Sequence, residues 1–317
     1  QQVLELENGS DDGDEYDYSP ARDEWLLTSG HLTAEVSYQH QPWQSTATIS
    51  LNMPLPRTLE DRAARTLSSE MPVTITVTLA KNSRRIEIEL ALENRAEDHR
   101  LRVLIPTPFA SQTVVADNQF GCITRPVDDA AMANWEAEGW KEAPVPVWQL
   151  MNFAALQDGH QGLALFTEGL REFEVVGEKR DTFALTLFRA VGVLGKENLL
   201  LRPGRPSGIK MPTPDSQMPG QQRYRFALLG FSGDHLQASV MQHARDYLTP
   251  VRTYNKIPYD AMKLNLTDNK TPSRYSLMQK CISGTVLSAL KKAEDDEALI
   301  VRVYNPSETQ SLADSVQ

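Results

Sequence analysis

The sequence predicts an all-β fold, a large antiparallel β-sandwich, and three observations support this prediction. Residues 73–79 and 85–90 alternate apolar and polar side chains with a period of two, as strands with one buried face do. Lys81, Asn82 and Ser83 between these runs form a hairpin-turn signal. Many short runs of this kind occur, with turn residues between them, and helical patterns are few. This combination is typical of packed sheets.

The remaining elements follow from the same patterns. Asp234 can cap a helix that runs through Tyr247, and residues 59–66 can form a shorter helix. Two long irregular stretches, residues 128–146 and 202–220, are rich in proline, and loops of this length are usually functional. Further strands are expected at residues 3–6, 25–28, 32–38, 46–51, 101–105, 147–156, 162–166, 172–176, 183–188 and 224–229.

The strand pattern is continuous to about residue 248, and this sets the predicted domain boundary. Residues 249–274 are a polar connector, and two short strands follow at residues 284–290 and 298–304. We therefore expect a sandwich domain at residues 1–248. Residues 249–317 would form a connector and a small, partial C-terminal β extension.

Composition excludes several classes of partner. The formal net charge is −10, so nucleic acid and anionic membranes are not expected partners. The chain has no apolar run near the roughly 18 residues that a membrane helix needs. Cys122 and Cys281 give neither a metal spacing nor a disulfide framework, which fits a reducing compartment, and we expect a cytoplasmic protein. Because both ends fall within strand patterns, we also expect a piece of a longer polypeptide.

Motifs that would carry chemistry on their own are missing from the sequence. The six histidines lack the HxH and HExxH spacings of metal sites, so we expect scattered surface histidines. The acidic run at residues 11–18 has its glycine misplaced for an EF-hand, which favours a solvated acidic turn over a calcium site. Nucleophile-elbow and phosphate-loop motifs are lacking. We assign no catalytic residue and no metal ligand to this chain.

Arginine and tyrosine are the remaining candidates for binding. Arg189 follows an apolar strand, where a guanidinium must be paired or face a polar cavity. Two roles are possible for Arg189: it could form a structural ion pair, or it could contact a sugar at the rim of a binding site. Arg125 gives a weaker signal of the same kind. Tyr16 and Tyr18 in the acidic run present a similar choice, because each phenol could meet a sugar or pack under its loop.

Six stretches of the chain, taken in order, carry a family resemblance. They read Gly-Asp-Glu-Tyr-Asp-Tyr-Ser-Pro (13–20), His-Arg-Leu-Arg-Val-Leu (99–104), Trp-Lys-Glu-Ala-Pro-Val-Pro-Val-Trp (140–148), Glu-Gly-Leu-Arg-Glu-Phe-Glu (168–174), Phe-Arg-Ala-Val-Gly (188–192) and Arg-Pro-Gly-Arg-Pro-Ser-Gly (202–208). Together they resemble the C-terminal β-region of glycoside hydrolase family 38, the α-mannosidases. The resemblance implies a sandwich of the galactose-mutarotase-like supersandwich type.

The resemblance also implies what this chain lacks. In the family, an N-terminal barrel carries a zinc ion and the nucleophile, and its opening pattern His-x-Asp-x-x-Trp occurs nowhere in these 317 residues. We therefore expect no cofactor in this chain and zinc in the barrel of the parent enzyme. The expected partners are that missing N-terminal catalytic domain and a mannose-containing small molecule. A homo-oligomer is left open.

The implied function is support of an active site that lies on the absent barrel. The parent would be a retaining α-mannosidase acting on mannosylglycerate or its 6-phosphate, and this chain would be inactive alone. By motif position, Arg189 and Tyr16 match an arginine and a tyrosine that the family's β-region contributes to substrate binding, with Tyr18 as the alternative. The competing interpretations are a stand-alone carbohydrate-binding module, a mutarotase-like epimerase and an oligomerisation platform.

Overall fold

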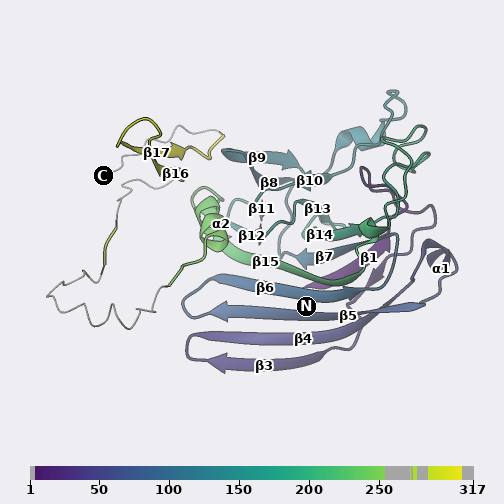
Figure 1. The fold of residues 1–317 in the computed structure, drawn as a ribbon, viewed down its shortest axis with the longest axis horizontal. Coiled ribbons are helices and arrows are strands. Elements are labelled where there is room, and N and C mark those ends of the chain that lie inside the picture. The colour runs from purple at the N-terminus through teal and green to yellow at the C-terminus, as the bar shows by residue number, and fades with distance from the viewer. Residues whose placement is uncertain (1–3, 254–271, 273, 277–284, 309–317) are drawn as a thin grey trace.

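The computed structural model describes residues 4–253, 272, 274–276 and 285–308, and its main body is a sandwich of two antiparallel sheets (Figure 1). One sheet has six strands, in the order β10 (Val147–Gln149), β13 (Glu172–Val176), β14 (Thr182–Ala190), β7 (His99–Pro106), β1 (Glu5–Ser10) and β2 (Leu27–Thr28). The other has nine, in the order β3 (Glu35–Gln41), β4 (Gln44–Leu55), β5 (Ser69–Ala80), β6 (Arg85–Asn94), β15 (Gly220–Ser232), β12 (Gln161–Thr167), β11 (Phe153–Gln157), β8 (Thr113–Asn118) and β9 (Gly121–Pro126). The predicted all-β sandwich is confirmed.

The main core lies between the two sheets, because alternate residues of the facing strands are apolar. Leu101 and Val103 of β7 are fully buried and share one apolar cluster with Ile75 of β5. The same alternation places Arg100 and Arg102 on the opposite, outer face of the six-stranded sheet. The sequence pattern of one strand therefore fixes both a core and the floor of a polar site.

A second apolar layer covers the outer face of the nine-stranded sheet. Helix α2 (Val240–Leu248) packs Val240 and Ala244 onto Phe166 of β12 and Leu229 of β15. The predicted helix from Asp234 begins later than expected. Asp234 instead accepts hydrogen bonds from the backbone nitrogens of residues 236 and 237 in a preceding turn. Helix α1 (Leu59–Ala63) lies within the predicted range and is capped by the Thr58 side chain.

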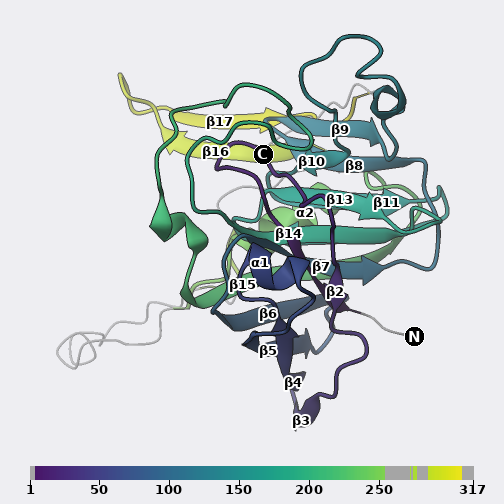
Figure 2. The same ribbon diagram turned by 90° about the vertical axis from the view of Figure 1, so that its right-hand side faces the viewer.

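The two predicted C-terminal strands are present as β16 (Val286–Lys292) and β17 (Leu299–Tyr304), and they pair with each other as a separate hairpin. Figure 2 shows this hairpin beside β9. The Tyr304 ring meets Phe120 edge to face at 5.7 Å, and Glu308 accepts a hydrogen bond from the backbone nitrogen of Thr124. Much of the predicted connector at residues 249–274, together with Val3, Cys281 and Gly284, lies outside the described residues.

One predicted strand, residues 147–156, is wrong, since it is two strands in different sheets. The chain leaves β10, crosses between the sheets at residues 150–152 and enters β11. The Asp117 carboxylate stabilises this crossing, because its Oδ1 accepts the backbone N–H groups of Met151, Asn152 and Phe153 at 2.8–3.0 Å. No helix among the described residues is long and apolar enough to cross a membrane.

Candidate functional site

The outer face of the six-stranded sheet carries three buried or half-buried arginines close together. Arg189 of β14 lies directly opposite Arg100 of β7 in the strand register, and Arg102 follows on the same face. Arg102 is paired with Glu7 and Glu174, each at 2.5 Å. Cations this close need carboxylates around them. Glu7 and Glu174 come from the neighbouring strands β1 and β13, and Asp11, which pairs with Arg189, comes from the loop after β1.

The acidic loop, residues 11–19, covers this row of arginines. The side chains of Asp11 and Asp14 have no exposed area, so the predicted solvated turn is wrong. Asp14 Oδ1 accepts the backbone N–H groups of Tyr16 and Asp17 at 3.0 and 2.8 Å. A Cβ atom at Gly13 would lie 2.1 Å from the carbonyl oxygen of Asp17, so only glycine allows this close approach.

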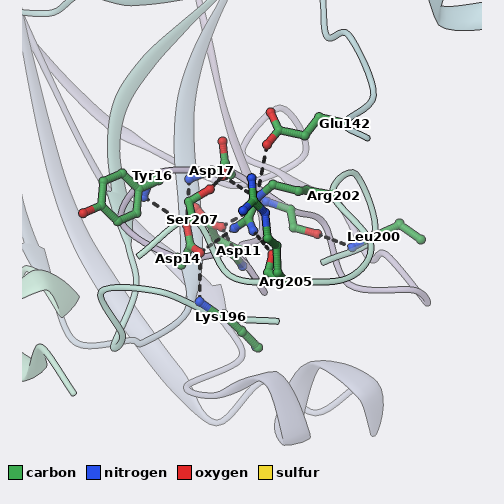
Figure 3. A network of polar contacts seen from close by, with 12 residues as sticks. Asp11, Asp14, Tyr16, Asp17, Glu142, Lys196, Leu200, Arg202, Arg205 and Ser207 are labelled. Atoms are coloured by element: carbon green, nitrogen blue, oxygen red, sulfur yellow. Dashed lines mark hydrogen bonds and ion pairs between the residues drawn. The ribbon is translucent and has the colours of Figure 1, made fainter. Parts of the chain in front are cut away.

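A second loop, residues 191–219 between β14 and β15, holds the acidic loop in place (Figure 3). Arg202 donates from Nη2 to Asp14 and from Nε to Asp17, both at 2.7 Å. Lys196 pairs with Asp12, and its backbone nitrogen donates to Asp14 Oδ2 at 2.9 Å. The carboxylates that first resemble a calcium loop are therefore neutralised by cations of the chain itself.

Arg189, the sequence-predicted binding residue, belongs to the same network. Its Nε and Nη2 donate to the two carboxylate oxygens of Asp11 at 2.6 and 3.1 Å, and Nη2 also donates to the carbonyl oxygen of Asp14. Burial alone would lower the pKa of Arg189, but the hydrogen bond and charge of Asp11 outweigh it and raise the pKa, so the guanidinium stays charged. Nη1 makes no hydrogen bond to any described residue. Arg189 therefore combines the structural ion pair with a free donor edge.

A pocket of about 210 Å³ opens above this network and brings the two predicted residues together. Its floor is the outer face of the six-stranded sheet, and its walls come from the acidic loop and from the loops that follow β9 and β14. The residues that line it are Tyr16, Asp17, Tyr18, Arg100, Glu142, Ala143, Val145, Val147, Gln149, Glu172, Arg189, Leu201 and Arg202. Both aromatic residues and cations thus face one small polar cavity.

The two tyrosines of the acidic loop have different environments. Tyr16 is 57% exposed, and its ring packs so closely on Gly208 that an added Cβ would lie 2.6 Å from Cε2. The Tyr18 ring lies under the Arg100 guanidinium, with 3.6 Å between Cζ and the ring centroid. Burial raises the pKa of Tyr18 to about 12, so its hydroxyl stays protonated. Tyr16 is the accessible phenol, and Tyr18 is the phenol that stacks against Arg100.

Arg125, the weaker sequence candidate, and His99 both lie outside this pocket. Arg125 stacks near Trp148 at 5.4 Å and donates to the carbonyl oxygen of Gln149, so the structure gives it a local packing role. His99 corrects the prediction of surface histidines, because it is 1% exposed and lies between Asn8 and Asn94 at 2.7 and 3.0 Å. Its ring nitrogens are both occupied by these amides.

A metal ion has no ready site in the part of the chain that the structure describes. Within those residues, no three histidine, cysteine, aspartate or glutamate side chains are arranged to hold one. The acidic side chains of the pocket are already bound to cations or hydroxyls; Glu172, for example, accepts from Thr186 at 2.9 Å. The described acidic residues of this pocket therefore do not fit a zinc ion.

Sequence reasoning missed Arg100 and Glu172, which both line the pocket. The signal was present, since Arg100 and Arg102 alternate with apolar residues in 99–104 and must share the outer face of their strand. What the pattern does not reveal is which neighbouring strand lies beside them, and β14 comes from residues far along the chain.

Comparisons with known proteins agree with this architecture. Residues 9–193 match the glycosyl hydrolases family 38 C-terminal domain, and residues 284–314 match the family 38 C-terminal beta sandwich domain. A curated relative from Halalkalibacterium halodurans, provisionally named as a mannosylglycerate hydrolase, is 28% identical over 254 residues, which cover 78% of this chain and 24% of the relative. The chain thus spans about a quarter of that relative's length.

Two solved structures from Enterococcus faecalis share the fold. A protein in glycosyl hydrolase family 38 has a TM-score of 0.80 at 23% identity, covering 99% of this chain and 35% of that one. An alpha-mannosidase of strain V583 has a TM-score of 0.79 at 24% identity, covering 99% and 34%. Since the matching family domain covers more than half of its residues, this chain belongs to glycosyl hydrolase family 38, as part of the family's C-terminal β-region.

Proposed function

We propose that this chain is the β-sandwich part of a retaining α-mannosidase and that it rims an active site carried by a preceding catalytic domain of the same polypeptide. The observation that carries the proposal is the small pocket in which Arg189 and Tyr16, the two residues matched by motif, lie together. Family membership and the quarter of the relative's length that the chain spans support it.

The chemistry of such an enzyme divides the work between domains. A retaining glycosidase uses two carboxylates about 5 Å apart, one as nucleophile and one as acid and base, and we place both on the catalytic domain. The role proposed for this chain is positioning. Arg189 is held by Asp11 on two of its nitrogens and keeps Nη1 for the ligand, so it can bind a sugar oxygen without moving a proton. Tyr16 offers an accessible hydroxyl beside it.

For the substrate, we propose mannosylglycerate or its 6-phosphate. The support is the name of the Halalkalibacterium halodurans relative and the cationic floor of the pocket. Both compounds carry an anionic group, and guanidinium donors match carboxylate and phosphate oxygens geometrically. A cytoplasmic location fits such a substrate and remains a prediction.

A paired assay tests the proposal. This chain and the full-length polypeptide, each supplied with zinc, are incubated with an aryl α-mannoside and with phosphomannosylglycerate. The proposal expects turnover by the full-length protein only. Turnover by the short chain alone would overturn it. Sugar affinity of the isolated chain without turnover by the full-length protein would instead support a carbohydrate-binding module.

Variants of the full-length polypeptide test the pocket itself. We expect Arg189→Met to lower kcat/KM at least tenfold, but this change also removes the partner of buried Asp11. Tyr16→Phe leaves the network intact because the Tyr16 hydroxyl makes no hydrogen bond to a described residue, and a loss of kcat/KM there reports on the ligand. Arg223→Gln, an exposed position on β15, is the matched control. Unchanged kinetics in both pocket variants would reject the proposed role.

A further inference from the structure

The roles proposed for Arg189 and Tyr16 leave a third residue of this pocket, Arg100, unexplained. It lies on β7, is 7% exposed, and lines the pocket beside Tyr18. The register places it directly opposite Arg189, so two like charges face each other across neighbouring strands. Directly opposed like charges destabilise a sheet unless other groups neutralise them.

The neighbouring arginines are each neutralised by carboxylates. Arg102 has Glu7 and Glu174, and Arg189 has Asp11. Arg202 has Asp14 and Asp17 in the same way. Glu172, which also lines the pocket, accepts a hydrogen bond from Thr186 at 2.9 Å and makes no ion pair with a described residue.

Arg100 differs from all of these. Among the described residues it has no hydrogen-bond acceptor and no carboxylate within 4.0 Å. Its one close partner is the Tyr18 ring, with 3.6 Å between Cζ and the ring centroid. A stacked ring supports one face of a guanidinium and leaves the N–H donors in its plane open. Arg100 is one of the residues that line the cavity.

Such an arrangement is costly unless a ligand completes it. Burial, and then the charge of Arg102, lower the pKa of Arg100 by more than the charges of the nearby Glu174 and Glu172 raise it. Buried charges in folded proteins are normally paired. The pocket also has about 210 Å³, below the roughly 300 Å³ of typical drug-sized ligand sites, so it suits a single small group.

We propose that Arg100 is the anion-binding residue of this pocket and that the group it binds is a carboxylate or a phosphate. The fork of Arg100 would bind two oxygens of the anion while Tyr18 holds the guanidinium plane from below. The identification of that anion as part of a mannoside rests on the proposed function. The presence of an anion site does not.

Calorimetry on the full-length polypeptide tests this directly. The probes are inorganic phosphate, D-glycerate and neutral methyl α-mannoside, titrated at constant ionic strength. We expect at least one anion to bind the wild type and to lose affinity tenfold or more in Arg100→Met, whereas Arg223→Gln behaves as the wild type. Whether phosphate alone, glycerate alone or both bind will identify the source of the anion. Equal affinity in wild type and Arg100→Met, or no anion binding to either, would overturn the proposal.

Thermal unfolding shows whether a loss of anion binding in the variant arises from a folding defect. Because Arg100 lacks a carboxylate partner, we expect Arg100→Met and Arg100→Gln to unfold at or above the wild-type temperature without ligand. Phosphate or glycerate should raise the Tm of the wild type and leave both variants unchanged. A Tm that falls in both variants, with a wild type that does not respond to the anions, would show a structural arginine and overturn the proposal.

The outcomes also separate this proposal from the proposed function. Methyl α-mannoside could bind the wild type and Arg100→Met equally while neither anion binds. That result would overturn the anion site and leave the mannosidase role in place. If the anions bind through Arg100 but the full-length polypeptide hydrolyses no α-mannoside, the anion site stands and the mannosidase role fails.

Discussion

Arg202 and Asp14 form a buried ion pair, with 2.7 Å between Nη2 and Oδ2, although 188 positions separate them in the chain. The pair ties the acidic loop to the loop between β14 and β15, and these two loops shape the pocket. Asp14 has no exposed area and also accepts three backbone N–H groups, from Tyr16, Asp17 and Lys196. The position of Tyr16 in the pocket therefore depends on this contact.

Removing the cation of that pair should destabilise the fold strongly. Arg202→Gln leaves the buried Asp14 charge without its partner, and breaking a buried pair from one side costs about 3–5 kcal/mol. Urea unfolding of the chain measures the free energy of unfolding. Arg205→Gln is the control, because Arg205 is exposed and contributes its carbonyl oxygen to Arg202. Equal stability of the two variants would contradict a structural role for the pair.

Gly13 should tolerate no side chain. In Gly13→Ala the new Cβ would lie 2.1 Å from the carbonyl oxygen of Asp17 and 2.7 Å from Asp11 Oδ1, so the acidic loop must open. We expect a loss of at least about 2 kcal/mol in the free energy of unfolding, as for other strained or overpacked sites. Gly121→Ala has no atom within 4 Å of the new Cβ and should change little. Similar losses in both would show that the close approach is unimportant.

Gly208 should control the orientation of Tyr16. A Cβ at position 208 would lie 2.6 Å from Cε2 of the Tyr16 ring, so Gly208→Ala must displace the ring from its place beside the pocket. In the full-length polypeptide we expect kcat/KM to fall by about as much as in Tyr16→Phe or more, because a misplaced positioning group loses its contribution. The double variant Gly208→Ala, Tyr16→Phe should then lose little more than Gly208→Ala alone. Full additivity in steady-state kinetics would argue against this coupling.

His99 should make stability depend on pH in the acid range. Burial, and then the charge of Arg62, lower its pKa from 6.5 to about 3 in the folded protein. Asn8 donates to its Nδ1 and Nε2 donates to Asn94, so a second ring proton would face a donor. Above pH 6.5 both states hold neutral histidine. As the pH falls from 6.5 towards 3, only the unfolded chain gains the proton, so stability falls by up to about 1.4 kcal/mol per pH unit.

Urea unfolding between pH 4 and 8 measures this slope. His99→Asn should be less stable at pH 8. Its free energy of unfolding should fall less steeply below pH 6.5, because the contribution of His99 to that fall is gone. His40→Asn is the control, since His40 lies on the exposed strand β3 and its hydrogen bond to Ser45 is exposed. An acid slope that is unchanged in His99→Asn would show that another group titrates.

Cys122 should be unreactive in the folded chain. It is 5% exposed, and burial raises the pKa of its thiol to about 12, so almost no thiolate forms at pH 8. In a Cys281→Ser variant, iodoacetamide at pH 8 should label Cys122 only after denaturant is added. Rapid labelling of the native protein, followed by mass spectrometry, would contradict the buried position.

The sequence by itself determined many of the strands and their inward faces, although the predicted strands include neither β8 nor β9 and join β10 to β11. Alternation in residues 73–79 and 85–90 survives as β5 and β6, and residues 81–83 form the turn between them, with Asn82 at φ 64°. These features are local, because a period of two and a turn residue with positive φ need no distant partner. The family resemblance was local too, carried by short motifs in fixed order.

Only the tertiary structure decided where charges are buried. Asp14, expected in solvent, is buried because Arg202 reaches it from another loop, and His99, expected at the surface, is buried because Asn8 and Asn94 satisfy its ring. Arg100 faces Arg189 because β7 and β14 pair, although the two residues lie far apart in the sequence. Burial of a polar group depends on partners far away in sequence, and strand periodicity contains no information about which strands become neighbours.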